Sequence, residues 1–248
     1  MKFERKPGLY ETGTTNLIYS WDELVSSGAI VVNKGAMTAS TTFEFAGELV
    51  LSDDGTITAI ATKAFKDHPE LALIVIPESV TKIGQYAFLR CSGLTSIAIP
   101  NSVTSIGNMA FQDCTGLTSV TISNSMTTIP NLLFYGCAAL TSITIPESVT
   151  QIIDGAFHGC TSLTSINIPD GVTSIGDGAF KYCSALTSIV IPEGVTKISV
   201  QTFLGCTNLT SIAFDGTVDQ WKAIPKGSNW NGSVPATEVI CSDGTVAL

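Results

Sequence analysis

Charged side chains are scarce in this sequence, and basic ones are the scarcest. Of 248 residues, 13% are charged, and 12 Lys and Arg stand against 21 Asp and Glu, a net charge of −9. No Lys or Arg occurs between Arg90 and Lys181. Proteins bind nucleic acids and anionic membranes through basic surfaces. We therefore expect neither as a partner.

Long apolar runs are also missing. Hydrophobic residues make up 44% of the chain, enough for a large core, but no run reaches the roughly 18 residues of a membrane-spanning helix. We expect no membrane insertion. The first residues, Met1 to Pro7, lack the apolar segment of a signal peptide. This part of the sequence therefore predicts no leader and leaves the location open.

Histidine occurs only at His68 and His158, 90 residues apart. His158 stands at a variable position of the repeat described below, which predicts a solvent-facing side chain. A Ser-His-Asp or Cys-His arrangement would need partners that these two residues do not have in the pattern. We therefore expect no enzyme and no cofactor.

The seven cysteines are never closer than 23 residues, whereas zinc sites use close pairs such as C-x₂-C. A disulfide needs Cβ atoms about 3.8 Å apart, closer than parallel in-register strands bring them. The reading we favour is a buried row of free thiols that pack as small apolar side chains. On that reading we expect no metal, and the cysteines do not indicate the redox compartment.

What the sequence does contain is a 23-residue repeat. Three residue types recur with this step: Leu71, Leu94, Leu117, Leu140, Leu163, Leu186 and Leu209; Phe65, Phe88, Phe111, Phe134, Phe157, Phe180 and Phe203; Cys91, Cys114, Cys137, Cys160, Cys183 and Cys206. Such self-similarity is typical of a solenoid, whose units stack in register because a single unit cannot bury enough surface to fold.

Each unit has room for one or two short strands and a turn. In residues 96–99, apolar and small side chains alternate, which indicates a strand with one buried face. Pro100 ends this strand, Ile106 suggests a second short one, and residues 109–111 suggest a single helical or 3₁₀ turn. The sequence therefore predicts a right-handed solenoid of 23-residue coils with a parallel β-sheet and the short turns on the other side.

Both ends depart from the repeat, so we expect an N-terminal cap over residues 1–46, about seven repeat units over residues 47–214, and a C-terminal cap over residues 215–248. At the start, residues 20–23 form a capping-box pattern for a helix to about Ser26, and residues 29–32 suggest an edge strand. At the end, Thr217 and Gln220 form a second capping box, residues 239–241 and 245–246 suggest a hairpin, and Trp221 and Trp230 are expected to seal the last coil.

Two outward columns, each a set of equivalent positions in successive coils, are candidate binding surfaces. Because side chains alternate along a strand, its first residue and the residue two positions later both face outward. They form a small, nearly uncharged face: Ser96, Ser119, Ser142, Ser165, Ser188, Ser211, Thr121, Thr144 and Asn167. The alternative is that small residues are what a curved sheet tolerates. An acidic rim follows the strand ends: Glu78, Glu147, Asp170, Glu193 and Asp215, with Asn101 and Asn124 between them. It suits a cation or basic partner, or equally a solvated edge.

The repeat LTSIxIPxxVTSIGxxAFxxC resembles the BspA-like (Treponema-type) leucine-rich repeat family. The stretch FDGTVDQWKAIPKGSNWNG…VICSDGTV resembles the segment that ends such arrays, and SWDELVSSG resembles a start of short members. The resemblance implies a leucine-rich-repeat solenoid and a bacterial surface or secreted protein used in adhesion, without catalytic residues.

These observations predict a monomeric, non-catalytic binding module that engages a protein or glycan through its repeat surface. The alternative is a rigid structural spacer with no ligand of its own.

Overall fold

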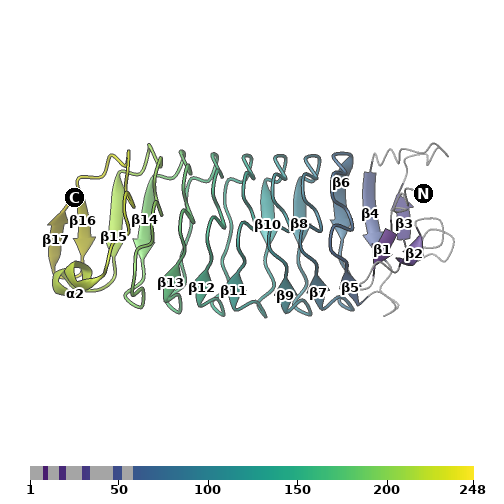
Figure 1. Ribbon diagram of the computed structural model, residues 1–248, viewed down its shortest axis with the longest axis horizontal. Helices are drawn as coiled ribbons and strands as arrows, with labels where there is room; N and C mark the ends of the chain where they lie inside the picture. The colour runs from purple at the N-terminus through teal and green to yellow at the C-terminus, as the bar shows by residue number, and fades with distance from the viewer. Residues whose placement is uncertain (1–7, 11–16, 21–29, 34–46, 52–57) are drawn as a thin grey trace.

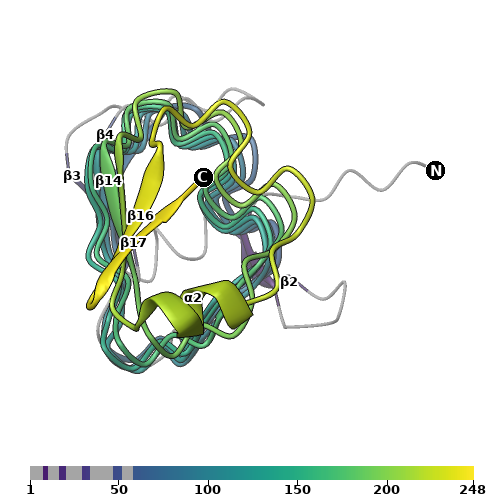
Figure 2. The same ribbon diagram turned by 90° about the vertical axis from the view of Figure 1, so that its left-hand side faces the viewer.

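The chain winds into an elongated stack of about eight coils (Figure 1). The computed structural model describes residues 8–10, 17–20, 30–33, 47–51 and 58–248, with side chains from residue 58 onward. Seen along the stack, the coils superpose around a common core (Figure 2). The predicted solenoid of 23-residue coils is confirmed.

One long side of the stack is formed by mainly parallel strands, which lie in a five-stranded and a four-stranded sheet and which we call together the long sheet. It contains β3 (Ile30–Asn33), β4 (Gly47–Leu51), β6 (Leu71–Val75), β8 (Ser96–Ala98), β10 (Ser119–Thr121), β14 (Ser188–Ile191) and β15 (Ser211–Phe214). Isolated parallel bridges from Thr121 to Thr144 and from Thr144 to Asn167 extend the five-stranded sheet through the middle coils. Strand β3 pairs antiparallel with β4 at the edge of the five-stranded sheet. This agrees with the edge strand predicted for residues 29–32. A separate antiparallel pair joins β1 (Gly8–Tyr10) and β2 (Leu17–Ser20).

A second side is formed by two-residue strands, in agreement with the second strand expected at Ile106. These are β5 (Ala59–Ile60), β7 (Lys82–Ile83), β9 (Ser105–Ile106), β11 (Thr128–Ile129), β12 (Gln151–Ile152) and β13 (Ser174–Ile175). They form two parallel three-stranded groups along the lower edge of Figure 1. In each strand the first residue is outward and the isoleucine is buried.

The third side consists of turns. Alternate backbone N–H groups, such as those of Met109, Phe111 and Asp113, donate to the next coil over 2.7–3.1 Å. The residues between them bond locally, as Gln112 N–H does to the Met109 carbonyl. Met109 and Asp113 have left-handed backbones, with φ of 60° and 56°. The turns lie where predicted, but residues 109–111 do not form a helical turn, because cross-coil bonding requires these left-handed residues.

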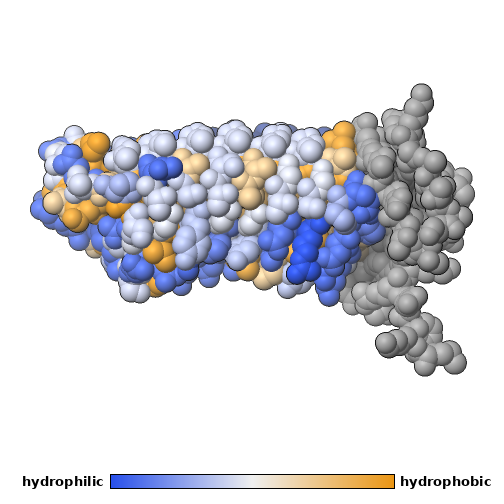
Figure 3. All heavy atoms as spheres, turned by 90° about the horizontal axis from the view of Figure 1, so that it is seen from above, coloured by the Kyte–Doolittle hydropathy of each residue, from blue (hydrophilic) through white to orange (hydrophobic). Residues whose placement is uncertain are grey.

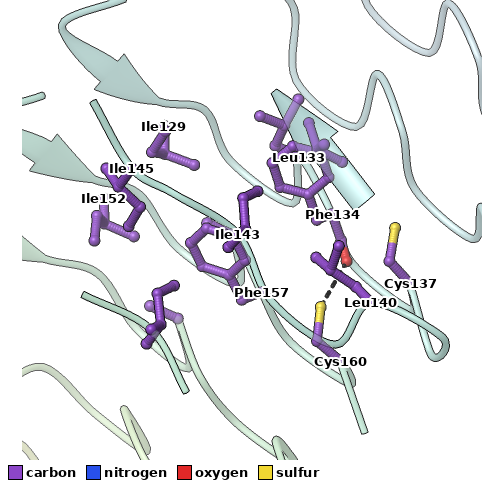
Figure 4. Close-up of a cluster of buried hydrophobic side chains, with 14 of the residues drawn as sticks. Ile129, Leu133, Phe134, Cys137, Leu140, Ile143, Ile145, Ile152, Phe157 and Cys160 are labelled. Carbon is purple, nitrogen blue, oxygen red and sulfur yellow. Dashed lines mark hydrogen bonds between the residues drawn. The ribbon is translucent and has the colours of Figure 1, made fainter. Parts of the chain in front are cut away.

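Identical residues stack through the core. The rings of the phenylalanine column lie 5.1–5.7 Å apart with interplanar angles of 2–18°. The leucine and cysteine columns run beside them, and Figure 4 shows this packing for two central coils. The unit that has Ser123 in place of proline buries this side chain, whose hydroxyl donates to the Val103 carbonyl over 2.7 Å.

The C-terminal end is closed by helix α2 (Val218–Ala223) and the hairpin of β16 (Glu238–Cys241) and β17 (Gly244–Ala247). The predicted capping box is present: Thr217 Oγ1 accepts from the Gln220 N–H, and Gln220 Oε1 accepts from the Thr217 N–H. Lys226 donates to the carbonyls of Trp221 and Ile224 at the helix C-terminus.

Trp221 and Trp230 are buried and pack on the last coil, as predicted. Their ring centroids lie 5.8 Å apart, and Trp230 meets the end of the phenylalanine column at Phe203 over 6.2 Å. The helix predicted for residues 20–26 falls outside the described residues except Ser20. Within the described part of the chain, no helix has the length and apolarity needed to cross a membrane.

Candidate functional site

The predicted serine face lies on the outside of the long sheet. Ser119, Ser142, Ser165 and Ser188 are exposed, and Ser96 and Ser211 at the two ends are half-buried. The strand register aligns Ser96 with Ser119 and Ser188 with Ser211. Thr121, Thr144 and Asn167 form the adjacent exposed column and are joined by backbone bridges. The structure therefore brings all nine residues onto one surface.

The serine hydroxyls differ from the threonine hydroxyls one position earlier. Thr118 Oγ1 donates to the Thr95 carbonyl over 2.9 Å, and Thr187 Oγ1 donates to the Thr164 carbonyl over 3.4 Å. This column of threonines thus bonds to the preceding coil. None of the six serine hydroxyls bonds to another residue within the described part of the chain. The serine column is therefore available to a ligand.

Apolar side chains extend this face at both ends, and Figure 3 shows apolar surface near both ends of the described part of the stack. Val75 lies outward on β6, and Val190 lies beside Ala213, which lies beside Ile240. Val190 and Ile240 are 43% and 48% exposed. The sheet face is therefore polar but uncharged in its middle coils and more apolar near the ends.

The acidic rim ends in a cavity of about 650 Å³ near helix α2, lined by Asp170, Glu193, Gly194, Asp215 and Gln220. Gln220 Nε2 donates to Glu193 Oε1 over 2.6 Å. In the coils with asparagine, the Asn124 N–H donates to Asn101 Oδ1. Among the residues described, no three His, Cys, Asp or Glu side chains are grouped to hold a metal ion. Among these residues, the acidic rim therefore has no group of three side chains arranged to bind a cation, which the cation-site interpretation would require.

The cysteines are buried and free, as expected. Each thiol of the column also donates to a phenylalanine carbonyl of the preceding coil, and Figure 4 shows the bond from Cys160 Sγ to the Phe134 carbonyl, 3.2 Å long. Burial raises the pKa of Cys91 and of Cys206 to about 12. The thiols therefore stay protonated and are poor nucleophiles.

His158 is not the solvent-facing residue that its variable position predicted. It is half-buried, and its ring stacks on Tyr135 with a centroid distance of 4.5 Å. Its buried Nδ1 has no hydrogen-bond partner among the described residues. Burial, followed by the charge of Lys181, lowers the pKa of His158. The prediction took the variability of this position as a sign of exposure, and so missed that Tyr135 and His158, which occupy it in consecutive coils, stack on each other.

The order of buried columns and paired short strands matches a known repeat. The family model of the BspA type leucine rich repeat region matches in six copies, over residues 58–185 and 127–224. The chain belongs to the BspA-type leucine-rich repeat family. No curated protein matches it in sequence.

Two solved bacterial leucine-rich repeat proteins resemble this chain in fold. A leucine-rich repeat protein of Bacteroides ovatus is 27% identical with a TM-score of 0.63, over 87% of this chain and 62% of that one. The leucine-rich repeat protein of T. pallidum is 27% identical with a TM-score of 0.51, over 76% of each chain. The chain thus spans less than two thirds of the length of the Bacteroides protein. BspA-type repeats are scaffolds that generally serve binding.

Proposed function

We propose that this chain is a non-catalytic, adhesin-like binding module that engages a protein or glycan through the outer face of its long sheet. The observation that carries the proposal is the row of serine hydroxyls without protein partners, beside threonines whose hydroxyls are already bonded. Small side chains let a partner approach the sheet closely, and free hydroxyls donate and accept hydrogen bonds. Repeat proteins present such extended surfaces to their ligands.

The family resemblance supports a bacterial surface or secreted location, which we include in the proposal. Antibody raised against the chain should label intact cells or the culture medium, and labelling only after lysis would contradict this location. The net charge of −9 favours partners other than nucleic acids. We further propose that the module acts as a monomer, which light scattering would test.

The decisive experiment places large cations on the sheet face. Ser142→Arg with Ser165→Arg covers two central coils, and both positions are exposed. The full chain and this variant would be tested on arrays of purified extracellular proteins and oligosaccharides. We expect the variant to lose at least about tenfold in affinity, since blocking a central contact typically costs more than 1 kcal/mol.

The matched control carries the same two charges on the second side. Gln151→Arg with Ser174→Arg changes outward positions of β12 and β13, and it should bind like the parent chain. Equal binding by the Ser142→Arg, Ser165→Arg variant would move the site off the sheet. If the parent chain binds nothing, and natural copies vary no more on the sheet face than elsewhere, the spacer alternative is favoured.

A further inference from the structure

Aromatic side chains from three consecutive coils meet on the turn side, away from the serine face. We call Tyr135, His158 and Tyr182 the aromatic ridge. Tyr135 and His158 are stacked at 4.5 Å, and the His158 and Tyr182 rings meet edge to face at 5.4 Å. Tyr182 is 47% exposed, the largest exposed side chain among the apolar and aromatic residues described.

The solenoid itself does not require the Tyr182 ring. The equivalent positions of the coils all have positive φ: Tyr182 has φ of 60°, three coils hold Gly136, Gly159 and Gly205, and three hold Asp67, Arg90 and Asp113. This backbone is unfavourable for a residue with a side chain. The ring lies against Gly205, where an added Cβ would be 2.3 Å from Tyr182 Cδ1. Because glycine, aspartate and arginine all serve at this position in other coils, the fold does not need the exposed ring of Tyr182, which is therefore free for a role outside folding.

A cation lies beside the ridge. Lys181 is the only Lys or Arg between Arg90 and Lys197. Its Nζ lies 5.1 Å from the Tyr182 ring centroid and donates to Gln201 Oε1 over 2.9 Å. No carboxylate pairs with it within the described part of the chain, although acidic residues outnumber basic ones. Two of its three donor hydrogens therefore remain for an anionic ligand.

The kind of ligand follows from what this side exposes, which is the ring of Tyr182. The cavity of the acidic rim is lined by residues outside the ridge. Protein partners anchor large side chains in pockets. A pyranose ring instead lies flat, and its C–H groups pack on the electron-rich face of an aromatic ring.

We propose that the aromatic ridge is a carbohydrate-binding site, and that Lys181 makes it prefer sugars that carry a carboxylate. Tyr182 supplies the stacking surface, Lys181 donates to the carboxylate oxygens, and Gln201 supplies hydrogen bonds to hydroxyl groups. This site is separate from the serine face, so it goes beyond the function proposed above.

The test compares lactose with sialyllactose, and a neutral with a uronic-acid-containing tetrasaccharide, by calorimetry on the full chain. Tyr182→Gly introduces the residue that three other coils have, so the fold is retained. Lys181→Gln introduces the residue found at the equivalent Gln112. Tyr86→Gly is the matched control: it removes another turn-side ring, at a left-handed position where other coils have Gly155 and Gly178.

We expect the parent chain to bind the carboxylated member of at least one pair more tightly than its neutral counterpart. Tyr182→Gly should weaken binding to both members at least about tenfold, from loss of stacking, while Lys181→Gln should weaken only the carboxylated one. Tyr86→Gly should bind like the parent chain.

Absence of binding to all four sugars would overturn the proposal, as would unchanged binding by Tyr182→Gly. If Tyr182→Gly loses only a protein ligand, the carbohydrate assignment is wrong. The Ser142→Arg, Ser165→Arg variant separates the two sites. Loss of sugar binding in that variant, with retention in Tyr182→Gly, would place the sugar on the sheet face, so this inference would fail while the proposed function stands.

Discussion

Stacking within the phenylalanine column should contribute to stability beyond simple burial. Phe157 and Phe180 are fully buried, and their rings are 5.5 Å apart at an interplanar angle of 2°. Parallel rings in contact are separated by about 3.5–4.0 Å along their normal. A centroid distance of 5.5 Å therefore means that these rings are offset, which is the favourable arrangement and is worth about 0.5–1.5 kcal/mol per pair beyond area burial.

A double-mutant cycle measures this contribution. Phe157→Leu and Phe180→Leu keep the sites apolar, so each should cost less than the roughly 3–5 kcal/mol of a Phe→Ala change. Unfolding in urea, followed by circular dichroism, should give a coupling energy of about 0.5–1.5 kcal/mol between the two sites. The control cycle pairs Phe157→Leu with Phe214→Leu, because the ring contact of Phe214 is with Trp221.

The control pair should be additive to within about 0.3–0.5 kcal/mol. If the Phe157 and Phe180 pair is equally additive, the rings contribute only through burial, and the reasoning about the stack is wrong.

Three further predictions concern the thiols, the helix cap and His158. The buried cysteines should resist iodoacetamide at pH 8 and react only after unfolding, because burial raises their pKa values. Rapid labelling of Cys137 in the native protein, measured by mass spectrometry, would contradict this. Thr217→Ala should destabilise the C-terminal end by about 1 kcal/mol through loss of the α2 cap, seen as faster hydrogen exchange in residues 218–224, whereas Thr217→Ser should restore protection. His158 faces Tyr135, Tyr182 and Lys181, and its pKa is lowered in the folded chain. The unfolded chain therefore takes up the proton first as the pH falls. As a result, the free energy of unfolding should fall as the pH drops below about 6.5. His158→Gln should show a smaller fall between pH 7.5 and 5.5 in urea titrations, and an equal fall would refute the assignment.

The sequence predicted most of the fold, because position in the repeat determines burial. Each Phe, Leu and Cys of the repeat is buried in the column where periodicity places it, and the C-terminal cap could be read from local signals such as Thr217 with Gln220. The turn conformation could not be read, since Met109 and Asp113 adopt left-handed backbones only because the neighbouring coil accepts their N–H groups. Local propensity contains no information on that cross-coil pairing.

The candidate site was predicted unevenly for a similar reason. Strand parity placed the serine face correctly, but it did not show which hydroxyls are free; that depends on the threonines that reach back to the preceding coil. The aromatic ridge was missed because only Tyr135 and His158 share a repeat position, and Tyr182 lies one residue beyond it in the next coil. Their rings touch because an aromatic ring is wide enough to reach the ring of the neighbouring coil. The spacing of residues in the sequence does not reveal such a contact.

Backbone bonding between successive coils has a mechanical consequence. A force along the stack loads each interface in series, and the weakest coil detaches without breaking the others. One released coil of 23 residues supplies about 75–80 Å of extended chain in place of about 4.8 Å of stack. A protein built this way lengthens under tension in equal steps while its remaining coils keep their binding surfaces intact.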